Sequence, residues 1–196
     1  MARRILHTVI LLLAAACCAT AGTADDEVKR NRDSALLLIK QGNYPDALTY
    51  FQKALAISPQ DPTINSGIGN VYAAMKQCDK GIPYLHKAQA VAPNDETALF
   101  GLGACYMDLQ KHEQAIPYLE KVVALRPDQP KPANVLAVAY VRRGIAFGRD
   151  GQNDNARKWV QKALELFQRI GNAQGVSDME QMLRTIPKDA PTATPQ

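Results

Sequence analysis

A repeat of 34 residues constrains the fold of this chain more than any other feature. Pro59, Pro93 and Pro127 are spaced by 34 residues, and the segment 82–85 (Ile-Pro-Tyr-Leu) recurs at 116–119. The same step, or twice that step, relates Gly69 to Gly103, Tyr72 to Tyr106, Ala54 to Ala88, and Ala47 to Ala115 with Gly81 midway. A strict period of this length is typical of arrays in which each unit buries its apolar face against its neighbours.

Each copy has the pattern of two helices joined by a polar turn. In the second copy, Ile64, Ile68 and Val71 recur at helical spacing, and the polar segment 76–79 follows. A second apolar stripe then begins at Ile82. The repeat therefore predicts a helical hairpin that recurs along the chain.

Small residues recur at fixed places in both predicted helices. Gly69 and Gly103 fall inside the first helix of their copies, where Gly costs about 1 kcal/mol relative to Ala. This repeated cost predicts close contact between helices. Ala47, Gly81 and Ala115 would supply the matching small residue on the second helix.

These residues resemble the tetratricopeptide repeat family. The small residues of the family match Ala35, Gly69 and Gly103 in the first helix and Ala47, Gly81 and Ala115 in the second, and its terminal proline matches Pro59, Pro93 and Pro127. The resemblance places copies at 28–61, 62–95 and 96–129. It implies an all-α fold, a right-handed superhelical array of antiparallel helix pairs (an α-solenoid) with a C-terminal capping helix.

A fourth copy, over 130–170, departs from the period. Its second half fits only after seven extra residues, which is close to two helical turns and keeps the same face inside. This offset predicts a lengthened first helix over 132–149 and a second helix over 155–169. Gly171 and Gly175 suggest a break, and an apolar stripe over 176–186 predicts the capping helix. The repeat domain would span 25–186, and the proline-containing tail 187–196 is expected to be disordered.

The N-terminal segment 1–24 has the parts of a secretory signal peptide. Arg3 and Arg4 precede an apolar run, and residues 5–24 contain no Asp, Glu, Lys or Arg. The segment 19–21 (Ala-Thr-Ala) offers a cleavage site. The chain is therefore expected to be exported, as a periplasmic or secreted protein.

Two alternatives keep the chain at a membrane. The segment 13–17 (Leu-Ala-Ala-Ala-Cys) resembles a degenerate lipobox, which makes Cys17 a candidate lipidation site of a membrane-anchored lipoprotein. An uncleaved anchor is the other alternative, although polar residues dilute the run below the roughly 20 apolar residues that a span needs. A membrane contact is expected only through such an anchor or through lipidation.

The resemblance also implies a concave groove lined by the first helix of each copy. The lining residues are expected to be Arg32, Leu36, Ile39, Asn70, Phe100, Met107, Asn134, Val138, Val141 and Arg142. Such a surface, small and apolar, suits an amphipathic helix or an extended peptide segment. Phe100 and Met107 are candidate anchors, and the alternative is that both pack within the array.

One specialisation of the family does not fit this groove. Modules that grip the C-terminal peptide of heat-shock chaperones use Lys, Asn, Asn, Lys and Arg at set positions. The corresponding positions here hold Arg32, Leu36, Gly67, Thr97 and Gly101. At most one of the five fits, so no carboxylate clamp is expected.

Charge gives little evidence about partners. The formal charge is +4, or +2 after loss of Arg3 and Arg4, which provides no global argument for nucleic-acid binding. The segment 130–170 carries eight Lys or Arg and three Asp or Glu, so its charge is 8 − 3 = +5. This excess could serve an acidic partner or an anionic membrane surface, but a solvated helix face is the preferred interpretation.

Cys78 and Cys105 lie in adjacent copies. Export permits a disulfide between them if packing brings their Cα atoms within roughly 4.4–6.8 Å. Two separately buried thiols are the preferred alternative, because free Cys often packs as a small hydrophobe.

No motif of catalysis, phosphate-loop binding or metal ligation is found, and His86 and His112 are isolated. No catalytic residue, metal ligand or cofactor is therefore expected. The chain is predicted to be a non-catalytic protein–protein interaction scaffold that binds a peptide or protein segment. The alternative is a structural or assembly subunit of an envelope complex, such as a pilus or outer-membrane assembly system. The oligomeric state stays open.

Overall fold

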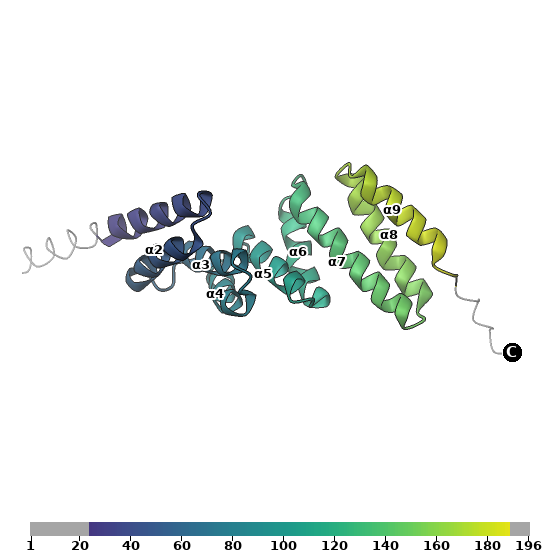
Figure 1. Ribbon diagram of the computed structural model, residues 1–196, viewed down its shortest axis with the longest axis horizontal. Coiled ribbons are helices and arrows are strands. Elements are labelled where there is room, and N and C mark those ends of the chain that lie inside the picture. Colours follow the sequence, from purple (N-terminus) through teal and green to yellow (C-terminus); the bar gives the residue numbers. More distant parts are fainter. Residues whose placement is uncertain (1–23, 189–196) are drawn as a thin grey trace, which may run out of the picture.

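The computed structural model describes residues 24–188, a part of the chain that contains helices and turns but no strand. A helix over 24–40 is followed by α2 (Tyr44–Ile57), α3 (Pro62–Ala74), α4 (Cys78–Val91), α5 (Glu96–Asp108), α6 (His112–Leu125), α7 (Pro130–Arg149), α8 (Asn153–Arg169) and α9 (Ala173–Thr185). Figure 1 shows these helices following one another along the long axis of the molecule. The predicted fold is confirmed: a right-handed α-solenoid of antiparallel helix pairs.

Side-chain caps determine where the first helices of two copies begin. The carboxylate of Asp61 accepts hydrogen bonds from the backbone N–H groups of Thr63 (2.7 Å) and Ile64 (3.1 Å). Asp95, one repeat later, accepts a bond of 2.9 Å from the N–H of Thr97. Each bond satisfies a donor that the first helical turn leaves without an intrahelical partner. The 34-residue period therefore includes the helix starts of α3 and α5.

Small residues form the contact between the two helices of a copy, as the repeat predicts. A β-carbon on Gly69 would lie 2.4 Å from Cγ of Leu85, and one on Gly81 would lie 2.7 Å from the carbonyl oxygen of Gly69. Ala47 and Ala115, at the place of Gly81 in the neighbouring copies, are fully buried. The predicted close approach of the helices is confirmed.

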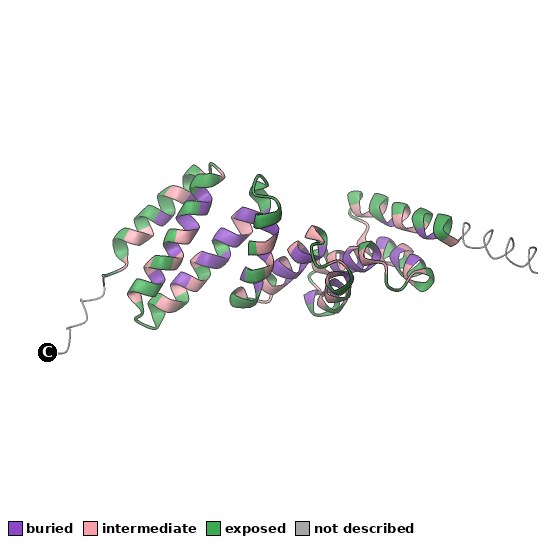
Figure 2. Cartoon of the chain, turned by 180° about the vertical axis from the view of Figure 1, so that it is seen from behind, coloured by how far each residue is buried: buried purple, intermediate pink, exposed green. Residues whose placement is uncertain are grey.

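Buried residues run along the whole array, in stripes on the facing sides of the helices (Figure 2). One cluster surrounds Phe51 and joins the helix over 24–40 to α2 and α3. A second includes Leu85 and Leu102 between α4 and α5, and a third extends from Leu119 to Met179. Since each cluster joins neighbouring copies, no single copy has a core of its own.

Helix α7 is longer than the equivalent helices of the preceding copies. It has 20 residues, whereas α3 and α5 have 13. It begins at Pro130, two residues before the expected start, and α8 begins at Asn153 instead of 155. The rings of Tyr140 and Trp159 lie 5.3 Å apart and join the two helices. The extra two turns of α7 thus pack on a lengthened α8.

The capping helix begins earlier than the sequence predicts. The expected range was 176–186, after a break at Gly171 and Gly175, but α9 spans Ala173–Thr185 and contains Gly175. The side chain of Asn172 caps the helix by accepting a bond of 3.0 Å from the N–H of Gly175. A β-carbon on Gly175 would lie 2.6 Å from Cγ of Phe167. This glycine therefore marks a close contact with α8 and not a helix break.

Several expectations concern the ends of the chain. The signal segment up to residue 23, with the lipidation candidate Cys17, and the tail from residue 189 lie outside the described residues. The helix over 24–40 includes residue 24 and begins before the expected start of the first copy at 28. Within residues 24–188, no helix combines the length and apolar character that a membrane span requires.

Candidate functional site

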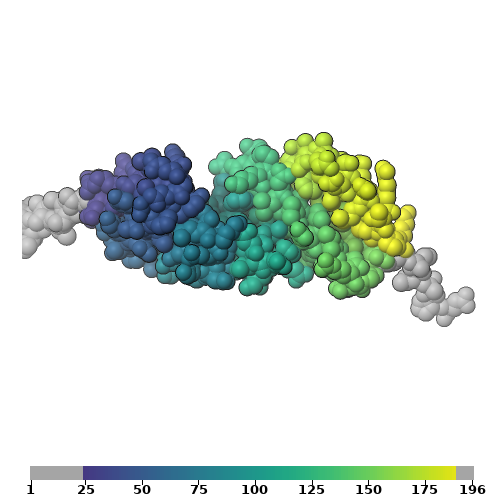
Figure 3. Space-filling view, in the orientation of Figure 1, coloured from purple at the N-terminus to yellow at the C-terminus, as the bar shows by residue number. Residues whose placement is uncertain are grey.

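A cavity of about 470 Å³ lies on the inner side of the array. It is lined by Leu36, Ile39, Gly67, Asn70, Glu96, Thr97, Phe100, Val122, Gln129, Lys131 and Pro132. These residues come from the helix over 24–40, α3, α5, the end of α6 and the start of α7. In Figure 3 the surface is hollowed between the blue N-terminal segment and the green segment that contains the start of α7. The superhelix thus brings together residues that are almost 100 positions apart.

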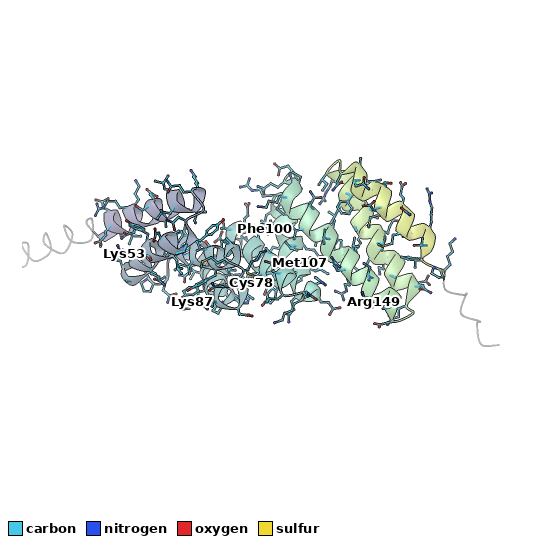
Figure 4. All side chains as sticks on the ribbon, in the orientation of Figure 1. Lys53, Cys78, Lys87, Phe100, Met107 and Arg149 are labelled. Carbon is cyan, nitrogen blue, oxygen red and sulfur yellow. The ribbon has the colours of Figure 1, made fainter. Side chains whose placement is uncertain are left out.

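The wall of this cavity, which we call the groove, is mainly apolar. Leu36 is 44% exposed, although it is a large aliphatic side chain. Phe100 is partly buried and lies near the centre of the array (Figure 4). The ammonium group of Lys131 lies 5.4 Å from the centroid of the Phe100 ring, within cation–π range. An apolar wall with a positive group beside its aromatic ring suits a segment that has both apolar and acidic side chains.

Asn70 is held in place by its own helices. Its Nδ2 donates to the carbonyl oxygens of Ser66 (2.8 Å) and Thr97 (3.2 Å), so it joins α3 to α5. A β-carbon on Gly101 would lie 2.5 Å from Oδ1 of Asn70. The amide is therefore a rigid part of the groove wall.

A second cavity of about 360 Å³ adjoins the groove and shares Leu36, Gly67 and Thr97 with it. Arg32 lines this second cavity, and its Nε lies 3.7 Å from Oδ1 of Asp33. Four predicted groove residues, Leu36, Ile39, Asn70 and Phe100, meet at the groove itself, and Arg32 lies beside it.

The other predicted groove residues do not line this cavity. Met107 and Val141 are partly buried against the C-terminal core, which is the alternative stated for Met107. Asn134 accepts a hydrogen bond of 2.9 Å from Nδ2 of Asn172, at the start of α9. Val138 is 42% exposed on α7. Arg142 lines a separate cavity near the α5–α6 turn.

Several groove residues were not predicted from the sequence. They are Gly67, Glu96, Thr97, Val122, Gln129, Lys131 and Pro132. The 34-residue step between Gly67 and Gly101 was a usable clue, since two more helical glycines at repeat spacing indicate a second close contact. Residues at the start of α7 give no such clue, because their approach to Leu36 depends on the curvature of the array.

Cys78 and Cys105 are buried free thiols that contact each other in one core cluster. Burial, followed by a hydrogen bond with Cys78, raises the pKa of the Cys105 thiol. The structure therefore has the preferred alternative of two thiols, and the bridge is not formed.

The groove contains no arrangement typical of catalysis or of metal binding. Within residues 24–188, no group of three or more His, Cys, Asp or Glu side chains could hold a metal ion. Glu96, the acid that lines the groove, pairs with Nε of Arg126 at 2.7 Å. The geometry can thus hold an apolar segment through shape and burial.

Comparison with solved structures shows the same fold in other proteins. The first tetratricopeptide domain of human RPAP3 is 23% identical over 59% of this chain and 91% of its own, with a TM-score of 0.56. A crystal structure of MamA is 20% identical over 74% of this chain and 81% of its own, with a TM-score of 0.59. A MamA structure from AMB-1 is 20% identical over 82% and 99%, with a TM-score of 0.57.

Sequence comparison identifies the family. No curated protein matches the chain significantly. A tetratricopeptide repeat family model matches residues 60–128 and 94–169, and a second model of the same repeat matches 35–76. The matches together cover 35–169, more than half of the chain, so the chain belongs to the tetratricopeptide repeat family.

Proposed function

We propose that this chain is a non-catalytic interaction scaffold that binds a segment of a partner protein in its groove, in the cell envelope. The family is in general a non-catalytic protein-interaction fold, which supports the general part of this proposal. The location rests on the signal-like segment 1–24 of the sequence.

The convergence of distant helices on the groove is the observation that carries the proposal. Leu36 of the helix over 24–40, Phe100 of α5 and Pro132 of α7 line the same cavity. Leu36 leaves apolar surface in contact with water, and its burial against a ligand would contribute about 25 cal/mol per Å². A preformed apolar site of this kind binds by shape, without a chemical step.

A structure of the same fold supports a peptide as the occupant. The first tetratricopeptide domain of Spaghetti (RPAP3), 23% identical to this chain, was solved bound to the HSP90 peptide SRMEEVD. The groove here lacks the residues of a carboxylate clamp, with Leu36 and Gly67 at two of the clamp positions. We therefore expect an amphipathic helix or an extended segment with apolar side chains, and not a C-terminal carboxylate, as the main anchor.

Capture of partners from envelope extracts tests the groove. Leu36→Asp places a charge on the exposed wall and Phe100→Asp places one at the centre, so both variants should lose the partner that the wild-type chain retains. Because Phe100 is partly buried, the exposed Leu36 is the safer of the two for folding, and circular dichroism should confirm it. Val91→Asp is the matched control, since Val91 is 52% exposed on α4 and lines neither cavity.

The control also separates the groove from other surfaces. If Val91→Asp loses the partner and Leu36→Asp retains it, the groove proposal is wrong and the outer surface of the array binds. Loss in Leu36→Asp alone supports the groove.

The sequence also favours a second candidate, an assembly subunit anchored in the envelope by a lipid on Cys17. The lipobox-like segment 13–17 is the observation behind it. The intact mass of the mature protein distinguishes the two. A cleaved chain without added mass supports the exported scaffold, and a chain that begins at Cys17 with added diacyl mass supports the anchored subunit.

A further inference from the structure

A second cavity lies away from the groove, where the turn between α5 and α6 meets the lengthened α7. Its volume is about 390 Å³. We call this place the elbow and define it by Gln110, Lys111, His112, Glu113, Arg142 and Arg143, all of which line the cavity. Three of these six side chains are permanent cations at neutral pH and one is an acid, so their formal balance is 3 − 1 = +2 with His112 neutral.

The repeat shows that the charge at this junction is reversed. In the preceding copy the turn residue Lys76 donates to Oδ2 of Asp108, at the end of α5, over 2.9 Å. A step of 34 residues takes these two positions to Gln110 and Arg142. The ion pair that closes the earlier junction therefore has no counterpart at the elbow, where a cation stands in place of the acid.

The lengthening of α7 adds a second cation. Residues 143–149 extend α7 by the seven residues that α3 and α5 lack. Arg143 is the first residue of this extension, and its guanidinium lies 4.4 Å from the ring centroid of Trp159 and 5.8 Å from that of Phe147. Its Nη2 lies 3.5 Å from Oε1 of Glu113. The aromatic contacts hold this guanidinium in one place before any ligand binds.

Two buried nitrogen atoms at the elbow have no hydrogen-bond partner in the described part of the chain. They are Nε of Arg143 and Nδ1 of His112. Such atoms are rare in folded proteins and call for a physical explanation. Next to them, α6 begins at His112 without a side-chain cap, so the positive end of its dipole adds to the field of the arginines. Cavity, charge and unpartnered donors all favour an anion.

We propose that the elbow binds a phosphate group through Arg142, Arg143 and Lys111. A phosphate carries about −1.5 to −2 charges at pH 7, which matches the formal balance of +2. A carboxylate would leave about half of that charge in place. Arginine suits this ligand because its planar group donates two parallel hydrogen bonds to an oxyanion.

The site includes a pH-sensitive group. Burial, followed by the nearby positive charge of Arg142, lowers the pKa of His112. The charged or titratable side chains that share its cavity are Lys111 and Glu113 near its own helix start and Arg142 and Arg143 from α7. A bound dianion offsets those cations, so it should raise the pKa of His112 and take up a proton. Sulfate is the suitable probe for this coupling, because it stays doubly charged over the range in which His112 titrates.

Calorimetric titration of the full chain with inorganic phosphate tests the site. At pH 7.5 and low salt, we expect saturable binding that Arg142→Gln combined with Lys111→Gln weakens by about tenfold or more, since two of three charge-assisted contacts are lost. Arg149→Gln is the matched control. It removes the same charge from the same helix but from a residue that does not line the cavity, so it should change the affinity less than about twofold.

Further arms identify the ligand class. Glycerol 3-phosphate replaces phosphate to show whether the site takes a phosphomonoester as well as the free ion, and tighter binding of either supports the proposal. Sulfate at saturation should raise the His112 pKa, as read from its ring NMR signals. The proposal is overturned if phosphate does not saturate, if Arg149→Gln weakens binding as much as the elbow variants, or if acetate binds as tightly as phosphate. Leu36→Asp should leave phosphate binding unchanged, which separates this site from the groove.

Discussion

Leu85 packs so closely on Gly69 that a β-carbon at the glycine would lie 2.4 Å from Cγ of Leu85 and 3.0 Å from the carbonyl oxygen of Gly81. Alanine would favour the helix by about 1 kcal/mol. The overlap outweighs that gain, because Leu85 is fully buried and the second obstacle is backbone. We expect Gly69→Ala to lower the free energy of unfolding by about 1–3 kcal/mol, measured by urea denaturation.

Gly148→Ala is the matched control for that substitution. A β-carbon there meets only the side chain of Ala156, at an ordinary contact distance of 3.8 Å, inside helix α7. Without a clash, the helix-favouring effect should remain and raise the free energy of unfolding by about 0.5–1 kcal/mol. If both variants gain stability, the close packing at Gly69 is wrong.

Arg157 holds the capping helix on the array. Its Nη1 donates to the carbonyl oxygens of Leu183 (2.6 Å) and Ile186 (2.9 Å), at the end of α9, where carbonyl groups lack intrahelical partners. Loss of these charged hydrogen bonds in Arg157→Gln should weaken the docking of α9 by about 1.5–3 kcal/mol. Amide hydrogen exchange should then rise by about tenfold or more over 173–185.

Exchange in α3 serves as the internal reference for Arg157→Gln, because contacts in a repeat array are local. An equal rise in α3 and α9 would mean that the variant lowers global stability. Unchanged exchange in α9 would show that Arg157 does not hold it.

Tyr140 makes the stability of the array sensitive to alkali. Burial raises the pKa of its hydroxyl, and so does the 2.7 Å hydrogen bond that this hydroxyl donates to Oε1 of Glu120. The neutral form is thus favoured in the folded state. Its contribution is complete below the unfolded pKa of about 10 and is lost as the pH rises above that value. The free energy of unfolding of the wild type should fall between pH 9 and 11 (about that range).

Tyr140→Phe removes the group that titrates, so this variant should show a smaller fall over the same pH range. Its free energy of unfolding at pH 7 should be lower than that of the wild type, because Glu120 loses its partner. Identical pH profiles for the two proteins would contradict the account of Tyr140.

The two core thiols should be inert in the folded protein. Cys78 is 3% exposed and Cys105 is 0% exposed, and burial raises the pKa of Cys105, which lowers its thiolate fraction. With Cys17 and Cys18 replaced by Ser, Ellman's reagent should react at least about a hundredfold more slowly in native buffer than in denaturant, since reaction requires opening of the core. Rapid labelling of either thiol under native conditions would contradict their placement.

Features that depend on one copy and its neighbour could be predicted from the sequence. The spacing of Gly69 and Gly81 predicted the close helix contact, and the seven-residue offset predicted the long helix that the structure shows as α7. These features repeat along the chain, so each copy supports the interpretation of the next. The start of α9 was wrong because Gly175 serves a single contact with Phe167, which no repeat reveals.

The groove could be predicted only in part, for a physical reason. Leu36, Asn70 and Phe100 were found because regular positions of the first helices face inward. Lys131 was missed because it reaches the groove through the curvature of several copies, which spacing within a copy does not report. Asn134 was assigned to the groove but bonds to Asn172, since the capping helix takes up the surface that another copy would leave open.

Site-specific photo-crosslinking tests most directly whether a partner occupies the groove. A benzophenone amino acid at position 36 lies on the exposed groove wall, and the same group at position 91 lies on an exposed residue that does not line the groove. After irradiation in the native envelope, we predict a crosslinked partner polypeptide from position 36 and none from position 91. A partner that crosslinks from position 91 and not from position 36 would contradict the account.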